Sequence, residues 1–163
     1  MNNELIAKEQ AVEDVRILAE RMAMLYYYFM KNIAAELGQE QAEKLTAKVI
    51  EEYGMECGKM ALEKVSAKGK ENTIANHAMS KDLPQCGWVV ETLENNKNKK
   101  VVKTTYCPFA ETWKNLGCEK WGRMYCYVDQ AKFKGYNAEL TCVHNKNLLD
   151  GDDYCILTIE DPV

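Results

Sequence analysis

No proline precedes Pro84 in this 163-residue chain. Throughout the same stretch, apolar residues recur at steps of three and four, which is the period of one helix face. Alanine, glutamate, lysine, leucine and methionine dominate its composition, and all of them form helices well. The stretch therefore predicts long helices: one begins with Leu5 on its apolar face and stops at Gly38, and a second restarts near Gln39. We expect a short third helix at Thr73–Met79.

Two glycines interrupt the second predicted helix. Gly54 and Gly58 lie on a helix whose other residues favour helical structure. Glycine is the weakest helix former after proline, so both positions are candidates for a bend.

The pattern changes to strands after Pro84. Trp88–Leu93 and Val101–Tyr106 are rich in strand-forming residues, and the polar residues 95–100 between them suit a turn. Pro108 then predicts the start of a short helix that Gly117 ends.

A further helix is expected over Lys120–Lys134, and two more strands over Glu139–His144 and Tyr154–Glu160. Asp150 and Gly151 supply the turn between those strands. The expected order is ααα-ββ-αα-ββ, an α+β fold with an N-terminal helical layer packed on a small antiparallel sheet. We expect one domain over residues 1–163, with residues 1–80 as the helical layer and 84–160 as the hairpins and helices.

Charge and cysteine usage narrow the class of protein. The formal net charge is −4, which does not favour nucleic acid as a partner. Seven cysteines cannot all pair within one chain, and the polar start Met1–Gln10 does not resemble a secretory signal. We therefore expect reduced thiols and a cytoplasmic protein.

The longest apolar run is Met22–Met30. Its nine residues are too few to cross a bilayer, which needs about 20, so we expect no membrane partner. The run is broad enough to be buried on several sides or to form a homodimer contact through the N-terminal helices.

Cys107 is the first candidate for chemistry. It directly precedes Pro108, so it occupies the N-cap of the predicted helix, where free N–H groups and the helix dipole favour a thiolate. Such a cysteine is a candidate nucleophile or ligand. The alternative is a small buried residue that ends a strand.

Cys126 and Asp129 are spaced three apart and share one face of the predicted helix. A carboxylate beside a thiol can act as a base or orient a substrate amine. The alternative is an exposed aspartate and an inert cysteine.

His144 and Cys155 end and begin the last two predicted strands. A hairpin turn over residues 145–153 would make them near neighbours, and a thiol–imidazole pair serves nucleophilic catalysis or metal binding. The alternative is a strand-end histidine beside a core cysteine. Cys-x-x-Cys, His-Glu-x-x-His, phosphate-loop and Gly-x-Ser-x-Gly motifs are all absent from the sequence.

A family resemblance rests on several motifs over about residues 86–160. They are Tyr106-Cys107-Pro108-Phe109-Ala110-Glu111, Leu116-Gly117, Tyr125-Cys126-Tyr127-Val128-Asp129, Gly135-Tyr136-Asn137, His144-Asn145-Lys146-Asn147-Leu148-Leu149 and Gly151-Asp152-Asp153-Tyr154-Cys155. In this order they resemble the L-2-amino-thiazoline-4-carboxylic acid hydrolase family.

The resemblance implies hydrolytic opening of a cyclic amidine, 2-amino-thiazoline-4-carboxylate, to a carbamoyl-cysteine on a bacterial route to L-cysteine. The family positions that the resemblance carries over are Cys107, Cys126, Asp129 and Cys155. We expect catalytic roles for Cys107, Cys126 and Asp129, with His144 assisting proton transfer. The candidate substrate-binding residues are Tyr106, Tyr125, Lys146 and Cys155. No metal or other cofactor is required, although a Cys/His/Asp set could hold zinc.

The order of elements also resembles, more loosely, vinyl-reductase-like and transport-particle ligand-binding domains. That likeness implies an alternative function, a small-molecule or haem sensor in which Cys107 supplies a thiolate ligand.

Overall fold

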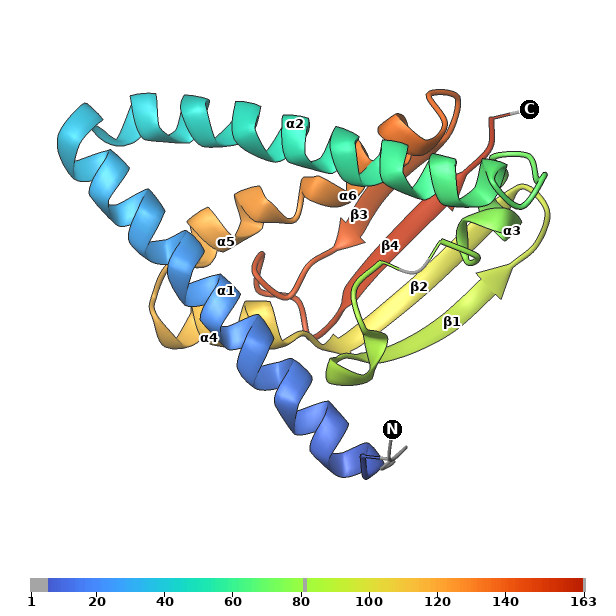
Figure 1. Ribbon diagram of the computed structural model, residues 1–163. Coiled ribbons are helices and arrows are strands. Elements are labelled where there is room, and N and C mark those ends of the chain that lie inside the picture. The colour runs from blue at the N-terminus through green and yellow to red at the C-terminus, as the bar shows by residue number, and fades with distance from the viewer. Residues whose placement is uncertain (1–5, 81, 163) are drawn as a thin grey trace, which may run out of the picture.

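The computed structural model describes residues 6–80 and 82–162. Leu5, where the predicted apolar periodicity begins, and most of the polar N-terminal start lie outside these residues. Two long helices open the fold, α1 (Lys8–Leu37) and α2 (Gln39–Ser66), and they form a V whose apex is Gly38 (Figure 1). Gly38 has a φ of 80°, a left-handed conformation that glycine adopts without steric cost. The predicted helices and their boundary are confirmed.

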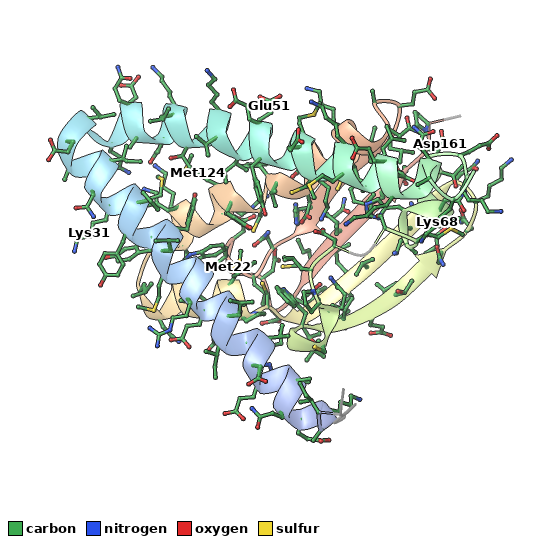
Figure 2. The ribbon with its side chains drawn as sticks, viewed as in Figure 1. Met22, Lys31, Glu51, Lys68, Met124 and Asp161 are labelled. Carbon is green, nitrogen blue, oxygen red and sulfur yellow. The ribbon has the colours of Figure 1, made fainter. Side chains whose placement is uncertain are left out.

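The helix α1 contacts the rest of the molecule along one side only. Ala19, Ala23 and Met30 are its buried residues. Met22 and Lys31 lie on opposite sides of the helix (Figure 2). Within the described residues, no helix combines the length and the apolar character that a membrane span requires.

Two hairpins make one four-stranded antiparallel sheet. The first joins β1 (Val89–Asn95) to β2 (Lys99–Tyr106), and the second joins β3 (Thr141–Lys146) to β4 (Cys155–Glu160). The strand order is β1-β2-β4-β3, so β2 and β4 pair in the centre, with Thr104 opposite Cys155. The α+β class predicted from the sequence is confirmed.

Short helices fill the connections. The helix α3 (Ile74–His77) is capped by the Thr73 hydroxyl, which accepts from the N–H of Asn76, and the 3-10 turn η1 (Gln85–Gly87) leads into β1. After β2, Pro108 opens α4 (Pro108–Asn115) as predicted.

The single helix predicted over Lys120–Lys134 is wrong, because α5 (Glu119–Tyr125) and α6 (Val128–Tyr136) are separate. Three helices, not two, therefore stand between the hairpins. At the break the N–H groups of Tyr127 and Asp129 bond three residues back, to Met124 and Cys126, instead of four.

The two helices are held by different partners, which is why no local signal marks the break. A Cβ on Gly122 of α5 would overlap the Trp113 ring, whereas α6 lies against α2. The helix α2 continues through Gly54 and Gly58, the two positions predicted to allow a bend, and both glycines lie in close contact with α6. A Cβ on Gly58 would overlap the carbonyl oxygen of Lys132.

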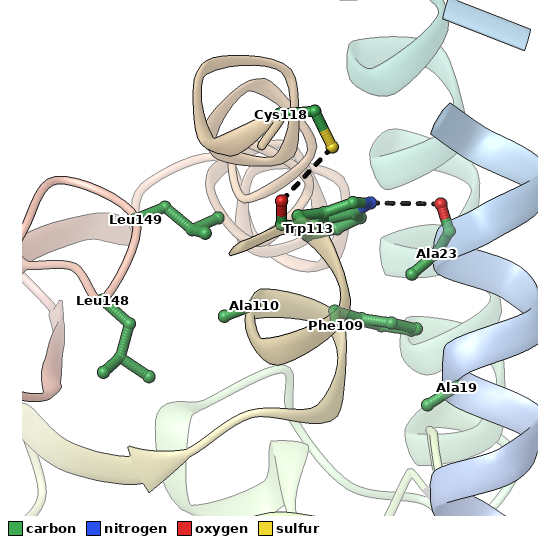
Figure 3. Packing of buried hydrophobic residues seen from close by; sticks show 8 residues of the cluster. All are labelled: Ala19, Ala23, Phe109, Ala110, Trp113, Cys118, Leu148 and Leu149. Atoms are coloured by element: carbon green, nitrogen blue, oxygen red, sulfur yellow. Dashed lines mark hydrogen bonds between the residues drawn. The ribbon is translucent and has the colours of Figure 1, made fainter. Parts of the chain in front are cut away.

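Apolar side chains form two clusters. The first joins α1, α4 and the β3–β4 turn (Figure 3) and consists of Ala19, Ala23, Phe109, Ala110, Trp113, Cys118, Leu148 and Leu149. In it, the indole Nε1 of Trp113 donates to the Ala23 carbonyl over 3.1 Å. The second joins α2, α3, α6 and the sheet and consists of Ala61, Val65, Ile74, Phe133, Tyr136, Leu140, Cys142 and Ile159.

Candidate functional site

A carboxylate on α6 is the centre of the candidate site. Asp129 lies in the first turn of α6, and its side chain is 27% exposed. Its Oδ1 is 3.1 Å from Lys132 Nζ, and its Oδ2 is 3.5 Å from His144 Nε2. The sequence proposed Asp129 and His144 separately, and the structure brings them into one ion-pair group because α6 packs against β3.

Lys132 extends this group toward the surface. Its side chain is only 16% exposed, and its Nζ is 2.9 Å from Asp82 Oδ2 as well as close to Asp129. Four titratable groups thus form a row from Asp82 through Lys132 and Asp129 to His144.

Within this row, Asp129 and Lys132 stabilise each other's ionised forms. Burial opposes ionisation of Asp129, but the Lys132 charge and the His144 hydrogen bond outweigh it, so the pKa of Asp129 lies well below its usual range. Burial likewise lowers the pKa of Lys132, yet the charges of Asp129 and Asp82 raise it above its ordinary value overall. Both groups are therefore ionised at neutral pH.

One ring nitrogen of His144 faces this carboxylate, and the other has no hydrogen-bond partner among the described residues. Its side chain is 6% exposed. Nε2 faces Asp129, which favours the tautomer that carries its hydrogen there. Nδ1 is buried and has no hydrogen-bond partner among the described residues. In that tautomer Nδ1 holds a lone pair, so it can accept a proton from a bound molecule.

Three cysteines border the first apolar cluster: Cys107, Cys126 and Cys155. Cys107 occupies the N-cap of α4, as the Cys-Pro sequence predicts. Burial raises the pKa of its thiol, and the N–H groups of Ala110 and Phe109 offset only part of that rise. The helix terminus thus favours the Cys107 thiolate in the expected direction, but burial outweighs this effect. The haem-sensor alternative stays a prediction.

Cys126 is also a neutral thiol. It caps the C-terminus of α5, and its Sγ donates to the Gly122 carbonyl over 3.7 Å. Burial raises the pKa of Cys126 to about 12, and the negative charge of Asp129 contributes to the rise. The predicted spacing of Cys126 and Asp129 thus places the two groups within electrostatic reach, although they belong to different helices.

Cys155 lies diagonally across the sheet from His144. The residue directly opposite His144 is Leu157, two positions along β4 from Cys155 and on the same face. The Cys155 sulfur accepts the N–H of Leu148 over 3.3 Å, and burial raises the pKa of this thiol.

The three remaining candidates differ in their surroundings. Tyr125 packs against Tyr26, Phe109 and Trp113, with ring centroids 5.4 to 5.5 Å away, and burial raises its pKa, with a smaller contribution from Asp129.

Tyr106 lies under the Arg16 guanidinium at 4.4 Å, beside a surface groove of about 570 Å³ between α1 and α4. Lys146 is 47% exposed and lies 4.8 Å from the Tyr154 ring. No described contact joins Tyr106 or Lys146 to Asp129.

The sequence reasoning missed Lys132, Asp82 and Asn147. Lys132 had a local signal, because it follows Asp129 by three residues on the same helix face. Asp82 had none, since it lies 50 residues away in the chain. A cavity of about 50 Å³ adjoins Lys132 and is also lined by Cys57 and His77.

The part of the chain that the structure describes contains no group of three or more His, Cys, Asp or Glu side chains arranged to hold a metal ion. A family model described as L-2-amino-thiazoline-4-carboxylic acid hydrolase matches residues 18–158. No curated protein and no solved structure matches the chain significantly. The looser likeness to vinyl-reductase-like and transport-particle domains stays a prediction.

Proposed function

Because the chain belongs to the L-2-amino-thiazoline-4-carboxylic acid hydrolase family, we propose that it opens a cyclic amidine such as 2-amino-thiazoline-4-carboxylate by hydrolysis. The product is a carbamoyl-cysteine. The observation that carries the proposal is the Asp129–His144 pair, in which His144 Nδ1 has no hydrogen-bond partner among the described residues and can serve as a general base. The family match covers the whole of this site.

In the proposed reaction, His144 Nδ1 takes a proton from water while the water oxygen bonds to the amidine carbon. Asp129 stabilises the imidazolium that results, as a carboxylate does for a histidine base. The bond from that carbon to a ring heteroatom then breaks, and the departing atom takes up a proton. Water is the only co-reactant, and the atoms balance.

The cysteines take the acid role more readily than the nucleophile role. With a pKa near 12, the Cys126 thiol is protonated at neutral pH. It can relay to the departing ring atom the proton that His144 took from water, so that both groups return to their starting states. Cys107 supports the same function as a second neutral thiol. Lys132 acts as a positioning residue, because its charge keeps Asp129 ionised.

The test is an assay of ring opening with 2-amino-thiazoline-4-carboxylate, followed by NMR of the product. We expect Asp129→Asn and His144→Gln to lower kcat by about 100-fold or more, the scale of general-base catalysis. Cys107→Ala and Cys126→Ser should lower it as well. Cys86→Ala, at an exposed cysteine far from Asp129 in the chain, is the control and should keep full activity. Full activity in Cys107→Ala and Asp129→Asn would contradict the proposal.

A further inference from the structure

The turn between β3 and β4 is built around one buried asparagine. Asn147 is 1% exposed. Its N–H donates to Asp152 Oδ2 over 2.9 Å, and its carbonyl accepts the N–H of Asp150 over 2.9 Å. Its side-chain Oδ1 accepts the N–H of Leu149 over 2.9 Å, which fixes the orientation of the amide. The Nδ2 donor is then left buried, with no hydrogen-bond partner among the described residues.

A second donor is held by the same turn. Arg123 on α5 donates from Nε to Asp150 Oδ2 over 2.8 Å, and its guanidinium lies 4.8 Å from the centre of the Tyr127 ring. Its Nη1 is buried and also has no partner among the described residues. The side chain as a whole is 18% exposed, so this donor lies near the surface.

Both side chains lie near the Cys126 thiol. The Asn147 amide and the Arg123 charge each lower the pKa of Cys126, against the larger effect of burial. Arg123 also lowers the pKa of Cys155. The two residues are linked through Asp150, which pairs with Arg123 by its side chain and with Asn147 by its backbone.

Buried donors without acceptors destabilise a fold, so their presence points to a missing acceptor. A guanidinium N–H and an amide N–H can together bind the two oxygens of a carboxylate. A charged acceptor compensates a buried guanidinium better than a neutral one does.

We propose that Asn147 Nδ2 and Arg123 Nη1 form a carboxylate-binding subsite beside Cys126. The ligand class is a small carboxylated ring of amino-acid origin, and its carboxylate fixes the position of the reacting carbon. The identity of that ring rests on the proposed function, but the subsite itself rests on the two unpartnered donors.

The test compares two probes that differ only in the carboxylate: 2-amino-thiazoline-4-carboxylate and 2-amino-2-thiazoline. Binding is measured by calorimetry and turnover by NMR. Asn147→Asp keeps an oxygen for the Leu149 N–H, removes the Nδ2 donor and adds a negative charge, and the control variant carries the same added charge. Arg123→Lys keeps the positive charge opposite Asp150 and removes the planar guanidinium with its Nη1 donor. Asn145→Asp is the matched control, because Asn145 is exposed on β3 and uses only its Oδ1, as an acceptor from Thr158.

We expect Asn147→Asp and Arg123→Lys to weaken binding of the carboxylated probe by at least tenfold and to raise its KM. Binding of the carboxylate-free probe should change little, and kcat for the carboxylated probe should fall because its reacting carbon is less well positioned. Asn145→Asp should behave as the unsubstituted protein. Circular dichroism checks folding, and if Asn147→Asp does not fold, Arg123→Lys carries the comparison.

The outcomes separate the two proposals. Carboxylate-selective binding that depends on Asn147 or Arg123, without turnover, supports the subsite and overturns the proposed hydrolysis. Turnover with equal affinity for both probes overturns the subsite, and the two donors then bind ordered water. The subsite is also overturned if the variants lose affinity equally for both probes. It is overturned as well if neither probe binds to the protein.

Discussion

At the scale of single residues, burial decides which groups carry charge. His77 packs between Phe133 and Tyr136, with ring centroids 4.7 and 4.8 Å away, and its Nε2 has no partner among the described residues. Burial first, and then the Lys132 charge, lower the pKa of His77 to about 4. The histidine is therefore neutral in the folded protein at neutral pH.

This depressed pKa predicts a pH-dependent stability. The unfolded chain binds a proton at His77 near pH 6.5, whereas the folded protein does so only near pH 4. The contribution of His77 is thus complete above about pH 6.5 and is lost as the pH falls toward 4. It amounts to about 3 kcal/mol at most.

Urea unfolding between pH 7.5 and 5 measures the effect. The unsubstituted protein should lose stability over this range, and His77→Phe, which keeps an aromatic ring beside Phe133, should lose clearly less. All other titratable groups are common to both proteins. Parallel curves would show that the His77 pKa is not depressed.

At the scale of secondary-structure elements, the contact between α2 and α6 positions the site. A Cβ on Gly58 would overlap the Lys132 carbonyl oxygen, and one on Gly135 would overlap the Met55 carbonyl oxygen. The two helices thus approach through glycines, and α6 brings Lys132 and Asp129 against His144.

Gly58→Ala should therefore destabilise the protein by about 2 kcal/mol or more, as overpacking does, and lower activity because α6 must move. In an isolated helix the same change would stabilise by about 1 kcal/mol. Ala47→Gly at an exposed position of α2 gives that intrinsic difference as a control. Thermal unfolding and the ring-opening assay measure both effects, and a neutral or more stable Gly58→Ala protein contradicts the close contact.

At the scale of the whole molecule, α1 keeps an exposed apolar stripe: Leu18, Met22, Leu25 and Phe29. Their spacing of four, three and four residues places them on one helix face. Leu18, Leu25 and Phe29 are 59%, 59% and 61% exposed, which is unusual for apolar residues that lie together. The homodimer predicted from the sequence stays a prediction, and this stripe is where we expect the contact.

Analytical ultracentrifugation of the protein at micromolar concentration tests the predicted homodimer. We expect a dimer, and we expect Leu25→Glu combined with Phe29→Glu to give a monomer, because the contact would then bury unpaired charges. Val90→Glu on β1, at a residue 42% exposed, is the control and should leave the dimer intact. If the unsubstituted protein is a monomer, the predicted homodimer is wrong.

Much of the fold follows from local signals in the sequence. The three- and four-residue periodicity, Gly38 and Pro108 determined the two long helices and the start of α4, because these signals act on the backbone within a few residues. Runs of strand-forming residues separated by turn residues likewise determined both hairpins.

Only the tertiary structure decided the chemistry of the candidate site. Packing of α6 between α2 and β3 broke the expected helix at Cys126, joined Asp129 to His144 and added Lys132 with Asp82. Burial of the Cys107 thiol against the first apolar cluster likewise outweighs the effect of its helix terminus on the thiol pKa. The physical reason is that charge pairing and desolvation depend on groups that are distant in the chain, and no local pattern records how closely they approach.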